Sequence, residues 1–80
     1  MNDKGIQQHI EELVAEEEDL WARADDTPLD AQERRRLDEI GVQLDQYYDL
    51  LRQRRARRES GRNPDGAEIR SGEVVENYVE

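Results

Sequence analysis

One histidine occurs in the chain, His9, and two glutamates follow it at helical spacing. Glu12 and Glu16 lie three and seven residues after it, so all three side chains would share one ridge of a helix. Helical bundles hold metals with inward-facing Glu and Glu-x-x-His sets. Here the order is His-x-x-Glu, and His9 lies beside the apolar row of the helix. We therefore assign no metal ligands and no cofactor, and a metal-binding bundle is the weakest of three functional hypotheses.

A run of arginines is the second group that could do chemistry. The stretch from Leu50 to Gly61 reads LLRQRRARRESG, and five of the seven residues from 52 to 58 are arginine. Arginine clusters bind phosphate, and a basic patch attracts nucleic acid even when the whole chain is acidic. The possible basic binding patch consists of Arg52, Arg54, Arg55, Arg57 and Arg58.

The surroundings of these arginines favour a structural interpretation. The net charge of the chain is −9, and no stacking aromatic residues alternate with the arginines. Cations in the last turns of a helix interact favourably with its dipole, at about 0.3–1 kcal/mol each. Asp49 and Glu59 lie at helical spacing from Arg52 and Arg55, and the tail adds further carboxylates. We expect contacts with acidic residues of the same chain first, an acidic protein partner second and nucleic acid third.

Composition excludes several classes of protein. The chain has 80 residues, no cysteine and 41% charged residues, which allows one domain and no disulfide or thiolate metal site. No apolar stretch approaches the roughly 20 residues of a membrane span, and none has the length of a signal peptide. A Ser/His/Asp set and a Gly-rich phosphate loop are also missing. We expect a soluble cytoplasmic protein without catalytic residues.

The spacing of apolar residues predicts two long helices. Over 3–24 these residues recur at steps of four, three and seven, and a second row further along has steps of three and four. These are the periods of packed helices. Thr27 is the expected N-cap, with Pro28 at the first helical position of a helix over 28–59. The short connection predicts an antiparallel, coiled-coil-like hairpin and an all-α fold.

A two-helix hairpin has a thin core, and chains this small usually need a staple or a partner. We therefore expect a homodimer, most simply a four-helix bundle; the alternative is that the tail covers the remaining apolar surface. The second helix should be longer by about 10 Å, so that its last apolar residues project beyond the first helix. The predicted interface consists of Ile6, Ile10, Leu13, Leu37, Ile40, Leu44, Tyr47, Leu50 and Leu51.

Two residues interrupt the helical pattern. Glu17 falls on the apolar row, where a buried carboxylate is costly unless it is paired. It could pair with Arg36, or with Arg34 of a partner, or lie at an edge open to water. Gly41 lies within the second helix at a cost of about 1 kcal/mol relative to alanine. It marks either the close approach of another helix or simple tolerance.

The chain divides into a hairpin over 1–60 and a tail over 61–80. A turn is expected at 63–66, where the sequence reads NPDG. Apolar residues then recur on one side of a short helix over 73–79. So short a helix is marginal in water, and we expect it to be ordered only when it is docked on another surface.

Three stretches carry a resemblance to a known family: IEELVAEE, ERRRLDEIGVQLDQYYDLLRQRRARRESGRNPD and EVVENYV. They span nearly the whole chain. Together they resemble a family of short, uncharacterised bacterial proteins, a domain of unknown function from high-GC Gram-positive species. The resemblance implies a small helical protein in which the arginine run and the C-terminal stretch belong to the family pattern. It implies no catalytic residue, ligand or partner. The leading hypothesis is a non-catalytic interaction or assembly protein, and the alternative is a nucleic-acid-associated regulator that uses the basic patch from Arg52 to Arg58.

Overall fold

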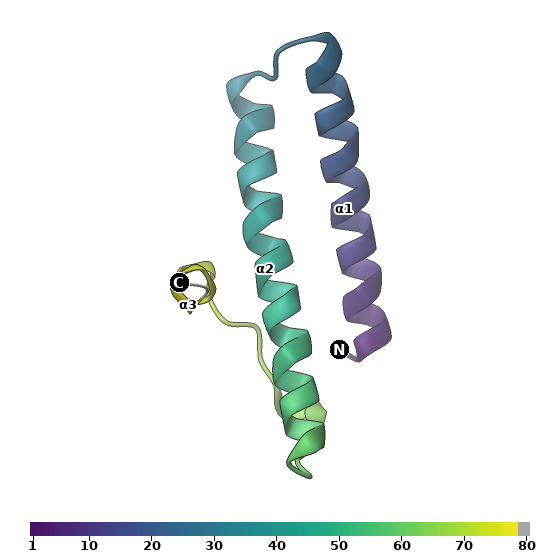
Figure 1. Cartoon of the computed structure of the whole chain (residues 1–80), viewed down its shortest axis with the longest axis vertical. Coiled ribbons are helices and arrows are strands. Elements are labelled where there is room, and N and C mark those ends of the chain that lie inside the picture. Colours follow the sequence, from purple (N-terminus) through teal and green to yellow (C-terminus); the bar gives the residue numbers. More distant parts are fainter. Residues whose placement is uncertain (79–80) are drawn as a thin grey trace.

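Two long antiparallel helices form the body of the molecule (Figure 1). The computed structural model describes residues 1–78 and the side chains of residues 1–76. Helix α1 spans Asp3–Asp26 and helix α2 spans Ala31–Glu59. A 3₁₀ turn, η1, follows at Pro64–Gly66, and a short helix, α3, at Gly72–Tyr78. The predicted all-α fold, a two-helix hairpin followed by a short helix, is confirmed.

Both helices of the hairpin begin at capping side chains. Asn2 accepts a hydrogen bond from the backbone N–H of Gly5 at 2.8 Å. At the start of α2, Asp30 accepts one from the N–H of Glu33 at 2.7 Å, and the Glu33 carboxylate accepts one from the N–H of Asp30 at 3.1 Å. This reciprocal arrangement is a capping box, which satisfies two N–H groups that the helix leaves free.

The predicted N-cap at Thr27 is therefore wrong, and α2 begins at Ala31 instead of residue 28. Thr27 is the C-cap of α1, and its N–H donates to the carbonyl of Arg23. The same arginine forms an ion pair with Glu33 across the loop. With the cap at Asp30, Glu33 has two roles, one in the capping box and one in this ion pair. Helix α1 continues to Asp26, two residues further than predicted.

The shifted loop also changes the register between the helices. Asp3, at the start of α1, contacts Arg54 and Arg58 of α2. The two helices therefore overlap further along α2 than the sequence predicted, although the C-terminal end of α2 still extends past the start of α1 (Figure 1). Leu50 does not project beyond α1: it is 4% exposed, and Leu51 is half-buried.

The core lies along the line where the apolar rows of α1 and α2 meet. Ile40 is fully buried and packs in one cluster with Leu20 and Leu44. Four half-buried side chains cover this cluster: Ile10, Leu13, Val14 and Leu37. Ile6 is fully buried as well. The buried apolar contacts between α1 and α2 are confined to this narrow seam.

The tail turns back and packs on the side of α2 that faces away from α1 (Figure 1). Gly61 adopts a φ of +75° after the end of α2, a conformation that favours glycine. Gly72 lies so close to Val42 that a Cβ there would be 2.5 Å from its Cγ1, and Val75 of α3 is 1% exposed. Of the predicted helix over 73–79, residue 79 lies outside the described residues.

No helix within the described residues is both long and apolar enough to cross a membrane. Gly41 has no atom of the chain within 4 Å of the position that a Cβ would take, apart from its neighbours and its own helix backbone. The close approach considered for Gly41 is therefore not made by α1 or by the part of α3 that the structure describes.

The capping box gives a test of the loop. We expect Asp30→Ala to lower the free energy of unfolding by about 1 kcal/mol, because it removes the acceptor for the N–H of Glu33. Thr27→Ala is the matched control and should change it by less than about 0.5 kcal/mol. Urea denaturation of the two variants measures both values. A larger loss in the Thr27 variant would contradict this assignment of the cap.

Candidate functional site

Arg54 is the most buried of the predicted basic patch, at 5% exposed. Its Nε donates to Asp3 Oδ1 at 2.5 Å. Its Nη1 donates to Asp65 Oδ1 at 3.0 Å and to the carbonyl of Pro64 at 3.2 Å. One guanidinium therefore joins the start of α1, the end of α2 and η1. Arg54 serves the fold and is not available to an external phosphate.

The other arginines of the run contact carboxylates as well. Arg58 donates to Asp3 at 2.8 Å, and Arg55 pairs with Glu59 at 3.2 Å. Arg52 lies 3.9 Å from Asp49. The expected pairs within α2 are thus present. Two partners come from other segments: Asp65 belongs to the tail, where carboxylate partners were expected, and Asp3 belongs to α1, where none was predicted. Within residues 1–76, Arg57 is the member of the run without an ion pair.

Hydrogen bonds from arginine change the acidity of two carboxylates. Arg54 first, and then Arg58, hold the pKa of Asp3 below its usual value. Arg36 does the same to the pKa of Glu16, and Glu16 in turn raises the pKa of Arg36. The folded structure therefore stabilises the charged forms of Asp3, Glu16 and Arg36.

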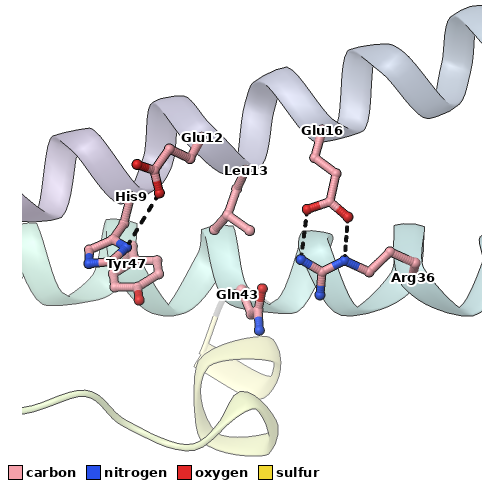
Figure 2. A pocket seen from close by; sticks show the side chains of 7 residues that line it. All are labelled: His9, Glu12, Leu13, Glu16, Arg36, Gln43 and Tyr47. Atoms are coloured by element: carbon pink, nitrogen blue, oxygen red, sulfur yellow. Dashed lines mark hydrogen bonds and ion pairs between the residues drawn. The ribbon is translucent and has the colours of Figure 1, made fainter.

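A polar groove runs along one side of the hairpin (Figure 2). The guanidinium of Arg36 binds both oxygens of Glu16, at 2.5 and 2.8 Å. The ring of His9 stacks on Tyr47, with the centroids 5.4 Å apart. His9 Nδ1 is 4.0 Å from Glu12. The predicted ridge is thus real, but its members contact residues of the hairpin.

This groove offers no assembled metal site. No group of three His, Cys, Asp or Glu side chains within the described residues could hold a metal ion. Glu16 is bound to Arg36, and His9 is stacked on an aromatic ring, so the ridge contributes to packing between the helices. The assignment of no metal ligands stays a prediction until metal content is measured.

The opposite side of the hairpin carries exposed apolar residues. Trp21 is 58% exposed and Tyr48 is 42% exposed. Trp21 lines a cavity with Glu17 of its own helix and with Arg34 and Leu37 of α2, so the two helices present one continuous surface here. A helix turns by about 100° per residue, so residues seven or eleven positions apart point in nearly the same direction. Leu37 and Tyr48 therefore share one stripe of α2, and Val14 and Trp21 share one stripe of α1. We define the apolar face as Ile10, Val14, Trp21, Leu37, Gly41 and Tyr48.

Glu17, Arg34 and Asp38 are the charged residues that line this cavity. Of the three possibilities that the sequence left for Glu17, pairing with Arg36 is wrong, because Arg36 binds Glu16 and Glu39. Glu17 is half-buried, Arg34 is exposed, and no ion pair among residues 1–76 includes either of them. Asp38 is also outside every ion pair among these residues, so two carboxylates and one guanidinium line one cavity unpaired within residues 1–76.

The nine residues of the predicted interface fall into two groups. Four of them are buried in the single chain and are not accessible to a partner: Ile6, Ile40, Leu44 and Leu50. Five are half-buried and keep accessible surface: Ile10, Leu13, Leu37, Tyr47 and Leu51. Sequence reasoning did not include Trp21 or Tyr48. The signal that could have found them is the second heptad stripe, one position away from the core.

The sequence comparisons identify the family. Residues 2–80 match a family described as "Protein of unknown function (DUF2630)". The chain belongs to this family. DUF2630 relatives include the uncharacterized protein Rv0898c of Mycobacterium tuberculosis strain H37Rv and the uncharacterized protein Mb0922c of Mycobacterium bovis. Each is 44% identical over 72 residues, which cover 89% of this chain and 83% of the relative. No solved structure matches the chain.

The DUF2630 match confirms the resemblance seen in the sequence. It covers both the hairpin and the tail. These relatives are themselves uncharacterized, so they assign no activity, ligand or partner to this chain. The function of this DUF2630 protein must therefore be argued from its own surfaces.

The ionic junction at Arg54 predicts a pH dependence. A lowered pKa means that ionised Asp3 stabilises the fold above the pKa of aspartate in the unfolded chain, about 3.9. This stabilisation is lost as the pH falls through the lower value of the folded state. We expect the unfolding temperature to fall below about pH 4. Asp3→Asn should have a lower unfolding temperature at pH 7 and a weaker dependence on pH in the acid range, measured by circular dichroism.

Asp25→Asn is the matched control for this experiment, because Asp25 is an exposed carboxylate at the other end of α1. It should follow the wild-type pH profile. An Asp3 variant with the wild-type profile would show that the contacts with Arg54 and Arg58 add nothing to stability.

Proposed function

We propose that this protein is a non-catalytic interaction or assembly protein that acts as a homodimer in the form of a four-helix bundle. The observation that carries the proposal is the apolar face, on which Trp21 and Tyr48 are exposed beside half-buried aliphatic side chains. A tryptophan and a tyrosine on one surface are typical of the centres of protein interfaces.

The thin core gives this proposal a second support. Within residues 1–76, six apolar side chains are buried, and one of these belongs to α3. Small domains without disulfides usually complete such a core by association. Tail docking was the alternative to a dimer, and α3 does pack on α2, but on the side near Val42. The apolar face lies elsewhere on α2, so the part of the tail that the structure describes leaves it open to a partner.

Contacts of the arginine run favour this proposal over nucleic-acid binding. Arg54 is buried in an internal junction, and Arg58 binds the same carboxylate of Asp3. Arg52 and Arg55 lie beside acidic residues of their own helix. A phosphate backbone would have to compete with each of these carboxylates. No observation specifically favours the nucleic-acid alternative.

Sedimentation equilibrium at micromolar concentrations tests the proposal. We expect a dimer for the wild type. Trp21→Ser should weaken the association by at least about tenfold, because truncating a buried interface tryptophan costs about 2 kcal/mol or more. Trp21 is the sole tryptophan of the chain, so its emission should also shift to longer wavelength as the protein is diluted.

Ile69→Ser is the matched control, since Ile69 is a 50% exposed apolar residue on the tail, away from the apolar face. It should leave the association unchanged. A wild type that stays monomeric and fully helical at all concentrations would disprove the homodimer.

A further inference from the structure

The sides of α2 differ in what covers them. Its buried row packs on α1. The tail occupies the side that carries Gln46 and Gln53, whose amides donate to the carbonyls of Arg70 at 3.1 Å and of Glu68 at 2.8 Å. Between α1 and the tail lies the polar groove, whose carboxylate Glu16 is already bound. The apolar face is therefore the side on which a neighbouring helix would find accessible hydrocarbon.

Charges on this face restrict which neighbour fits. The Glu17 carboxylate of α1 lines the same cavity as the Arg34 guanidinium and the Asp38 carboxylate of α2. None of the three forms an ion pair within residues 1–76. A partner that buries the face must supply a cation for the carboxylates, Glu17 foremost, and an anion for Arg34, since unpaired charges are costly to bury. A second copy of this chain supplies both, because an isologous interface pairs each residue in both directions.

Two symmetric arrangements of the copies are possible, and the charges distinguish them. With the two-fold axis parallel to the helices, α1 of one copy lies on α2 of the other at the same height. Glu17 of each copy then lies opposite Arg34 of the other, which gives two equivalent pairs. With the axis perpendicular to the helices, α1 of one copy lies antiparallel on α1 of the other. Glu17 then lies near the Ile10 end of the second α1, away from Arg34. We propose that two copies associate through the apolar face about an axis parallel to the helices, with Glu17 of each copy paired to Arg34 of the other.

This inference rests on the proposed function and gives the interface its geometry. Every helix of the resulting bundle lies antiparallel to both neighbours, which is favourable for the helix dipoles. The space beside Gly41, which no other part of the described chain fills, faces α1 of the second copy near Val14. A glycine within a helix then has a reason, because it lets the second backbone approach closely.

Charge reversal tests the pairing. Glu17→Arg and Arg34→Glu should each weaken dimerisation by about tenfold or more, since like charges are placed opposite each other twice per dimer. Mixing the two variants in equal amounts should restore association, because each supplies the charges that the other lacks. The double variant should also dimerise. Sedimentation equilibrium measures association, and circular dichroism confirms the helix content. Glu11→Arg, on the outer side of α1, is the matched control and should behave as wild type.

The position of the loops tests the axis. The chain lacks cysteine, so Thr27→Cys introduces a single site for a spin label at the tip of the hairpin. An axis parallel to the helices places the two labels at the same end of the bundle, within about 20 Å given helix spacings of about 10 Å. The other axis separates them by about the length of α1, which has 24 residues and thus extends about 36 Å.

The outcomes separate this inference from the proposed function. Loss of dimer in both single variants, recovery in the mixture and short distances between labels would support it. Dimers unaffected by charge reversal, no recovery on mixing, or labels at opposite ends would overturn the pairing while leaving the homodimer intact. A wild type that never dimerises would overturn both.

Discussion

The limited surface that two helices can bury against each other is the constraint on which this structure depends. A hairpin hides one row of side chains per helix, and here this row is complete: Ile6 and Ile40 have no exposed surface. Residues one position away from the row are only half covered, as Val14 and Leu37 are. Further apolar residues, including Trp21, lie outside the strip that the other helix covers. The apolar face exists because the apolar stripe on each helix is wider than the surface that two packed helices can bury.

Polar contacts connect the two helices at the ends of the hairpin, where the narrow apolar core does not reach. Near the loop, Glu33 combines a helix cap with an ion pair to Arg23. At the other end, Arg54 collects two carboxylates and a carbonyl from segments far apart in the chain. Arginine suits this role because its planar fork offers several donors in fixed directions. Four of the five arginines of the run thus lie beside carboxylates of their own chain.

Periodicity predicted the fold, and local chemistry predicted the boundaries less well. The three-and-four spacing through Ile40 and Leu44 was enough to infer an antiparallel hairpin. Two overlapping capping patterns, Thr27 with Asp30 and Asp30 with Glu33, competed for the start of α2. The structure uses the second pattern, and Arg23 adds an ion pair to Glu33 that local sequence does not reveal. The pairs within α2 followed from spacing alone, whereas Asp3 with Arg54 joins residues 51 positions apart and requires the three-dimensional arrangement.

Few apolar contacts attach the tail to α2. Val75 is the one side chain of the described tail that is fully buried, and the remaining contacts come mainly from polar side chains of α2, namely Gln46, Gln53, Asp49 and Arg54. Next to them Asp45 raises the pKa of Glu76 by charge repulsion, so the docked tail brings two acidic groups together. Segments with few apolar contacts open at a small free energy. We therefore expect the tail to leave α2 at a lower free energy than the hairpin needs to open.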